Sequence, residues 1–282
     1  MLIAGFPAGS FAANCYVLAA EPGAECVIID PGQDAEAGIE EILAEHRLKP
    51  AAVLLSHGHI DHVWSVAPVC GARDIPAFIH PADRELLSDP AKGFPLGVGQ
   101  QLFGGLEFTE PDDVRELTDG LTLDLVGLSI VVDHRPGHTR GSVTYGLPGE
   151  LTRSSGLDCA IDPLGARGDG VSPRGARGVW GDGFSSARGS GGWLPPEKNT
   201  GSPGGRPPGG TLFSGDLLFA GSIGRTDLPG GDDVAMAASL RRTMELPDET
   251  IVLAGHGPQT TIGAERHSNP FLKGAGSVTK GL

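Results

Sequence analysis

The run His-Gly-His-Ile-Asp-His at residues 57–62 is the most informative stretch of this sequence. It follows the short apolar run Ala52–Leu55, which predicts a buried strand, and a helix of roughly ten residues is expected to begin within it, with Asp61 and His62 on the first turn. Neutral imidazole and carboxylate oxygen are both common zinc ligands. Gly58 allows the chain to turn tightly between the first two histidines. The run therefore predicts a metal site at the corner between a strand and a helix.

Three later residues occupy similar settings, each beside glycine near the end of a predicted strand. His138 lies in Pro-Gly-His-Thr-Arg-Gly, Asp216 ends a predicted strand that begins at Thr211, and His256 follows the predicted strand Thr250–Ala254. Alone, each could simply be a polar residue that caps a strand. Together with the first run they supply five histidines and two aspartates, and such a set suits two metal ions.

The rest of the chain predicts strands that alternate with helices, which is typical of a layered α/β fold. The other predicted strands are Asn14–Ala20, Glu25–Asp30, Pro76–Ile79, Leu121–Leu125, Leu128–Val132 and Ser142–Leu147. Asp34 is expected to cap a helix that runs to about Arg47, and Asp232–Glu245 is expected to form another. A short helix is expected near the C-terminus.

Residues 151–210 have a different composition. Glycine and proline make up 23 of these 60 residues, and no apolar periodicity is present. Such composition predicts a disordered surface insertion within a single domain that covers residues 1–282. The alternative is a functional lid in which Trp180 and Trp193 pack on another part of the protein.

Charge and composition restrict the function classes. The 282-residue chain has a formal net charge of −14, so nucleic acid is not an expected partner. The four cysteines form no C-x-x-C pair and are expected to be reduced. The N-terminus does not resemble a signal peptide, and no apolar stretch is long enough to cross a membrane. We therefore expect a cytoplasmic protein that acts on a small molecule; the oligomeric state stays open.

The segments H-G-H-I-D-H, P-G-H-T-R-G-S, S-G-D-L-L-F and A-G-H-G-P resemble the ordered metal motifs of the metallo-β-lactamase superfamily. The resemblance implies an α/β fold, a four-layer αβ/βα sandwich. Asp30 matches an early aspartate of the family that is expected to orient the site. Residues 219–232 and 255–271 are similar to the short glyoxalase II-like branch, the hydroxyacylglutathione hydrolase-like enzymes, which is credited with hydrolysis of hydroxyacyl-thiol thioesters.

The family pattern implies a role for each of the seven residues. One metal ion would be held by His57, His59 and His138, a second by Asp61, His62 and His256, and Asp216 would bridge the two. The expected cofactors are two divalent metal ions, zinc first, with iron or manganese as alternatives.

The implied reaction is attack by a metal-bridging hydroxide on the thioester carbonyl, with Asp61 and Asp216 holding the hydroxide and the metals. Arg225 and Arg266 could bind a substrate carboxylate or could form exposed salt bridges instead. Longer glyoxalase II enzymes carry a C-terminal extension that binds glutathione, and we expect this chain to lack it, so the carrier thiol stays open.

Other reactions are compatible with the same scaffold. The main alternative is a mononuclear iron persulfide dioxygenase that uses only part of the ligand set. A relative that processes nucleic acid is disfavoured by the acidic charge. A true β-lactamase is disfavoured because no export signal is expected.

Overall fold

The first sheet holds the N-terminal half of the fold. The computed structural model describes residues 1–103, 105–148, 159–161 and 209–272, which all belong to one compact unit. Seven strands of this unit form the sheet in the order β10-β1-β2-β3-β4-β5-β6. Their bounds are β1 Leu2–Ala8, β2 Ala13–Ala19, β3 Glu25–Ile29, β4 Lys49–Leu54, β5 Ala77–Ile79, β6 Val114–Glu116 and β10 Cys159–Ile161. Strands β3 to β6 run parallel to one another, so the ends of β3 and β4 point the same way.

The second sheet has six strands in the order β15-β14-β11-β9-β8-β7. Their bounds are β7 Thr122–Leu125, β8 Leu128–His134, β9 Val143–Leu147, β11 Thr211–Gly215, β14 Ile251–Ala254 and β15 Thr260–Thr261. Strands β11 and β14 are parallel, which brings the residues that follow them to one edge of the sheet. A small hairpin, β12 (Leu218–Phe219) and β13 (Ser222–Ile223), follows β11.

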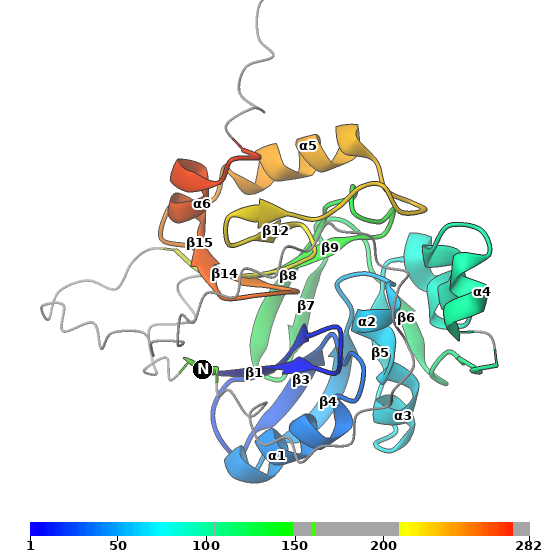
Figure 1. Cartoon of the computed structure of the whole chain (residues 1–282). Helices are drawn as coiled ribbons and strands as arrows, with labels where there is room; N and C mark the ends of the chain where they lie inside the picture. Colours follow the sequence, from blue (N-terminus) through cyan, green and yellow to red (C-terminus); the bar gives the residue numbers. More distant parts are fainter. Residues whose placement is uncertain (104, 149–158, 162–208, 273–282) are drawn as a thin grey trace, which may run out of the picture. The chain divides into compact units, whose positions relative to one another are not determined.

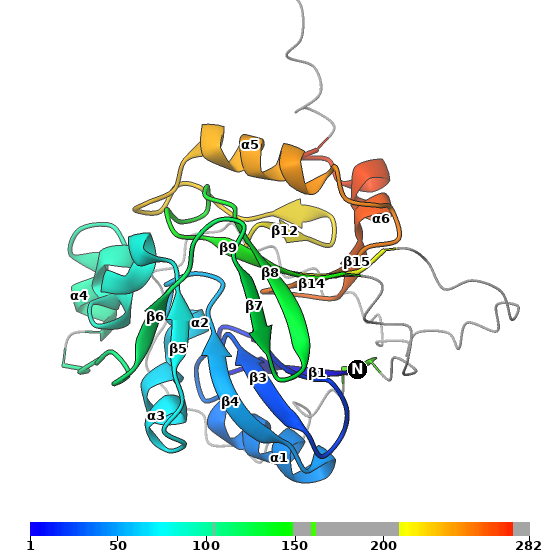
Figure 2. The ribbon, with the colours of Figure 1, turned by 180° about the vertical axis from the view of Figure 1, so that it is seen from behind.

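Helices cover the outer faces of the two sheets within this unit. The helices are α1 Glu36–His46, α2 Ile60–Val63, α3 Val66–Gly71, α4 Val98–Phe103, α5 Asp233–Thr243 and α6 Ile262–Ser268, with 3₁₀ helices η1 Pro81–Leu87 and η2 Pro90–Gly93. Helices α1 and α3 lie on one side of the first sheet, and α5 and α6 lie along the second (Figures 1 and 2).

Three apolar clusters account for this layering. Leu54 of the first sheet packs in one buried cluster with Ile130 and Tyr145 of the second, so this cluster lies between the sheets. A second cluster joins the other face of the first sheet to α1 and α3, and a third joins β11 and β14 to α5 and α6. Burial of these faces on both sides of each sheet produces an α/β fold of four layers.

Two predicted helix features are wrong. Asp34 does not cap α1: its φ is +55°, Ala35 occupies the cap position, and no side chain caps the helix. The helix of roughly ten residues begins as expected, with Asp61 and His62 in α2, but it does not continue: it is interrupted at Trp64 and Ser65, before α3. Pro68 lacks an N–H group, and its ring would clash with the carbonyl of the residue four positions earlier, which is Trp64.

The predicted disordered insertion at residues 151–210 lies mostly outside the described residues. The exceptions are Cys159–Ile161, which pairs parallel to β1, and residues 209–210. Within the described part of the chain, no helix combines the length and the apolar character needed to cross a membrane.

Candidate metal centre

The structure brings all seven predicted ligand residues together where strands of the two sheets end. Their donor atoms form three overlapping groups, and within each group the atoms lie within 4.8 Å of one another. The groups are His57 with His59 and His138, His57 with His62 and Asp216, and Asp61 with His62 and His256. The arrangement offers two adjoining positions for cations, because the first and last groups share no residue.

Asp216 stands between the two positions. Its Oδ1 lies 3.3 Å from His62 Nε2, and its Oδ2 lies 3.5 Å from His138 Nε2 and 3.7 Å from His256 Nε2. The two oxygens of one carboxylate therefore face histidines of both outer groups. This is the placement that a bridging carboxylate requires.

Asp30 and Ser56 orient two of the histidines. The Ser56 hydroxyl donates to Asp30 Oδ2 over 2.6 Å and lies 3.0 Å from His57 Nδ1, so that nitrogen is the donor to Ser56 Oγ. The Nδ1 of His62 lies 3.1 Å from the same Asp30 oxygen and donates to it. Because Nδ1 is the bonded nitrogen in both rings, Nε2 is the nitrogen that each ring turns toward the cluster, as metal-bound histidines commonly do.

His138 is oriented by the backbone and faces His59. Its Nδ1 donates to the carbonyl oxygen of Arg225 over 2.7 Å, which leaves Nε2 unprotonated. That Nε2 lies only 2.8 Å from His59 Nδ1. Two ring nitrogens at this distance need a proton or a cation between them.

A further observation supports metal binding by this donor set: two buried histidine nitrogens have no hydrogen-bond partner. Among the described residues, His57 Nε2 and His59 Nε2 are buried side-chain atoms that make no hydrogen bond. An unpaired buried polar atom is costly, so such atoms mark a missing ligand or a functional site. Imidazole nitrogens and carboxylate oxygens are ligands suited to zinc, iron or manganese.

Protonation is divided unequally across the cluster. Burial lowers the pKa of His57 well below its usual value, and that of His59 to about 3. Burial also acts to lower the pKa of His62, but Asp216 and Asp61 outweigh it and raise that pKa well above normal. The pKa of Asp216 is held far below its usual value, since His62 overcomes the effect of burial. The lowered pKa values of His57 and His59 thus favour neutral imidazoles, the form that binds metal.

The Asp30→Asn substitution is expected to weaken metal binding about 10-fold, the scale typical for a residue that orients metal ligands. The amide can still accept from Ser56 N, which now donates to Asp30 Oδ1 over 2.7 Å. Its NH₂ group would then face the Ser56 hydroxyl and His62 Nδ1. Chelator competition measures the change.

The matched control is Asp34→Asn. Asp34 is exposed and shares the positive φ of Asp30, at +55° against +50°. Asparagine tolerates this conformation as well as aspartate does, so backbone strain is equal in both variants. Equal metal affinity in the two variants would contradict the orienting role of Asp30.

The two predicted substrate arginines lie in different settings. The guanidinium of Arg225 is half-exposed and binds the Asp227 carboxylate through two bonds of 2.7 Å. Arg266 donates to the carbonyl oxygens of Met244 and Leu246, and it also pairs with Asp248.

The sequence patterns did not identify Ser56 or Asp83 as site residues. Ser56 links Asp30 to His57, and Asp83 is a buried carboxylate that contacts the loops on both sides of the cluster. Ser56 directly precedes His57, but its bond to Asp30 and the bonds of Asp83 join residues that only folding brings near.

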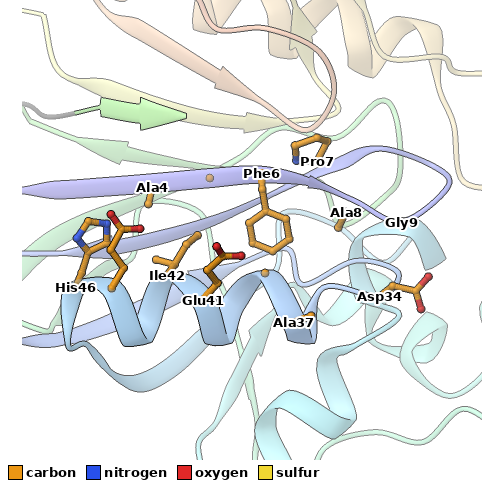
Figure 3. A pocket seen from close by; sticks show the side chains of 13 residues that line it. Ala4, Phe6, Pro7, Ala8, Gly9, Asp34, Ala37, Glu41, Ile42 and His46 are labelled. Carbon is orange, nitrogen blue, oxygen red and sulfur yellow. The ribbon is translucent and has the colours of Figure 1, made fainter. Parts of the chain in front are cut away.

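One hollow of the structure is separate from the metal centre. It measures about 250 Å³ and lies between β1 and α1, with Phe6 pointing toward the helix and Glu41 and His46 on the helix side (Figure 3). None of the seven ligand residues lines it. The candidate active site is therefore identified by its clustered donor atoms and not by this hollow.

Comparison with known proteins agrees with the fold. The Metallo-beta-lactamase superfamily model matches residues 8–151 and 177–256. An uncharacterized protein of Mycobacterium tuberculosis is 41% identical to this chain, over 97% of the chain and 99% of the relative. The chain belongs to the metallo-β-lactamase superfamily, which makes it a member of a metallo-hydrolase family with a metal-binding site.

Named relatives differ in what they are said to do. Hydroxyacylglutathione hydrolase GloC of Haemophilus influenzae is 28% identical, over 94% of this chain and 95% of its own length. Among solved structures, the BLEG-1 B3 metallo-beta-lactamase is 33% identical with a TM-score of 0.67, covering 96% of this chain and 99% of that chain. A di-iron-bound form of TTHA1623 is 34% identical with a TM-score of 0.60, covering 94% and 97%.

Proposed function

We propose that this protein is a dinuclear metal-dependent hydrolase that cleaves hydroxyacyl-thiol thioesters. The observation that carries the proposal is the pair of adjoining donor groups with Asp216 between them. The similarity to GloC, which spans nearly all of both chains, supports the substrate class. Zinc is the proposed metal, and the di-iron-bound relative makes iron the principal alternative.

The side chains of the site would bind the metal ions, and none of them is suited to act as the nucleophile. Two bound divalent ions would supply Lewis acidity and lower the pKa of a coordinated water. Ser56, the hydroxyl beside the cluster, donates to Asp30 and accepts from His57, so it is not available as a nucleophile. Asp61 and Asp216 face the histidines, and their negative charge offsets that of the cations.

A thioester suits a site with this composition. A thiol has a pKa of about 8.5, so a thiolate can leave without first receiving a proton from the enzyme. An amine or alkoxide leaving group would need a general acid. In this cluster the carboxylates are held ionised by histidine, as the lowered pKa of Asp216 shows, and are poor acids.

Arg225 is our candidate for binding a substrate carboxylate. Its backbone carbonyl orients His138, so the residue adjoins the cluster, and its guanidinium is half-exposed beside Asp227. Arg266 is the weaker candidate, because backbone carbonyls and Asp248 occupy its guanidinium.

The test is metal analysis of the purified protein, followed by a thioester panel on the same sample. We expect about two metal ions per chain, hydrolysis of hydroxyacyl thioesters, loss of activity on chelation, and recovery on addition of Zn²⁺, Fe²⁺ or Mn²⁺. The panel should vary the carrier thiol, with glutathione as one member.

Three results would contradict the proposal. Thioesterase activity that survives complete removal of metal would exclude a metal-dependent reaction. One iron per chain, together with oxygen uptake on glutathione persulfide and no thioester hydrolysis, would instead identify a persulfide dioxygenase. Hydrolysis of a β-lactam in place of thioesters would identify a lactamase.

A further inference from the structure

Asp83 is a buried carboxylate in η1 that lies outside all seven ligand positions. Only 1% of its surface is exposed. Its Oδ2 accepts from Gly58 N over 3.0 Å and from the Thr139 hydroxyl over 2.6 Å, and its Oδ1 accepts from Gly141 N over 2.7 Å. All three partners donate, so both carboxylate oxygens of Asp83 act as acceptors.

These partners lie in two separate loops that carry metal ligands. Gly58 lies between His57 and His59, and Thr139 follows His138 directly. The three histidines form the first donor group, and they come from opposite sheets. Asp83 thus joins the loop after β4 to the loop between β8 and β9.

A second contact joins η1 to the same β8–β9 loop. His80 accepts from Ala82 N at the start of η1, and its ring stacks on that of His134 at 4.0 Å and 8°. His134 in turn donates to the carbonyl oxygen of Arg140 over 2.9 Å. The position of η1 relative to the His138 loop is therefore fixed at two points.

The packing around Asp83 leaves no room for a side chain at Gly58 or Gly141. A Cβ added at Gly141 would lie 2.6 Å from Asp83 Cγ, and one added at Gly58 would lie 2.8 Å from the Asp83 carbonyl oxygen. The absence of side chains at these two glycines is what lets both loops approach the carboxylate. Hydrogen bonds to a charged acceptor are about twice as strong as neutral ones.

We propose that Asp83 is a positioning residue that sets the spacing of His57, His59 and His138 for one of the two metal ions. No hydrogen bond described joins Asp83 to the last donor group, Asp61 with His62 and His256. Loss of the Asp83 carboxylate should therefore weaken one metal site much more than the other. The inference rests on metal binding by the proposed dinuclear hydrolase.

The Asp83→Asn variant tests the charge with little change in volume. The NH₂ group that replaces one carboxylate oxygen cannot accept a hydrogen bond. Either Gly141 N or the pair Gly58 N and Thr139 Oγ1 therefore loses its acceptor. Thr139→Val removes the bond to Asp83 and leaves the carboxylate in place, although it also removes the 2.7 Å bond between the Thr139 and Ser142 hydroxyls. Thr139→Ser should restore both bonds.

Glu265→Gln is the matched control. Glu265 is also a buried carboxylate, and it accepts from Gly221 N at 2.8 Å, the Thr260 hydroxyl at 2.6 Å and Asn269 Nδ2 at 2.8 Å. Its bonds are of the same kind, but none goes to a loop next to a histidine of the first group.

The experiment is a two-site Zn²⁺ titration by chelator competition on each full-length variant, together with the visible spectrum of the Co²⁺-substituted protein and the melting temperature without metal. We expect Asp83→Asn and Thr139→Val to lower affinity at one site about 10-fold or more and to alter one set of Co²⁺ bands. Glu265→Gln should lower the melting temperature while both affinities stay within about 2-fold of wild type.

Unchanged affinity at both sites in the Asp83 and Thr139 variants would overturn the inference, as would equal losses at both sites or the same loss in Glu265→Gln. A wild-type chain that binds two metals but hydrolyses no thioester would overturn the proposed function and leave the role of Asp83 standing. A wild-type chain that binds no metal would overturn both.

Discussion

Asp216→Asn is expected to lower the rate of thioester hydrolysis about 1000-fold or more. Asp216 is the one ligand candidate whose two oxygens face histidines of both outer groups. Metal ions contribute several kcal/mol to transition-state stabilisation, and about 4 kcal/mol corresponds to roughly 1000-fold in rate. The neutral amide of asparagine keeps the shape of the side chain but removes the negative charge and one of the two acceptor oxygens.

The measurement pairs steady-state kinetics with metal content. The metal content of Asp216→Asn should fall from about two ions per chain to one or fewer. Asp124→Asn is the control: this exposed carboxylate lies on β7 and accepts from Ser129, outside the cluster. A variant at Asp216 that keeps two metals and more than a tenth of wild-type activity would refute the bridging role.

The clustering of the seven candidate ligand residues could be predicted because each one is marked by its immediate neighbours. When a candidate ligand follows an apolar strand and lies beside glycine, the local sequence alone identifies its position at a strand end. Strands that end at the same edge of a sheet then bring such residues close together. The run at residues 57–62 and the loop around His138 are both of this kind.

The residues that support the ligands could not be found in this way. Asp83 acts on Gly58 and Gly141, which are 25 and 58 positions away, and only the folded chain brings them together. The predicted helix failed at Trp64 and Ser65, because a proline four residues beyond Trp64 outweighs a favourable helical pattern. Strand β1 was not predicted, and it contains Gly5 and Pro7, which weaken a strand signal.

Gly255 is also a residue whose importance appears only in the fold. It precedes His256 and lies against the cluster: an added Cβ would be 2.2 Å from Asp216 Oδ1 and 2.8 Å from His62 Cε1. The backbone cannot retreat, since Gly255 N donates to Gly215 O over 2.8 Å and its carbonyl accepts from Asn14 N over 2.7 Å. A methyl group here must displace the Asp216 carboxylate.

Gly255→Ala is therefore expected to lower activity about 100-fold without altering any ligand, since a displacement of about 1 Å at a reacting centre can cost this much. Metal affinity should fall with it, as chelator competition would show. Gly71→Ala is the matched control, because a Cβ at Gly71 meets nothing within 4 Å, and stability there should change by less than about 0.5 kcal/mol. If Gly255→Ala binds metal and hydrolyses thioester as wild type does, the donor geometry described for Asp216 and His62 is wrong, and the ligand roles derived from it fail together.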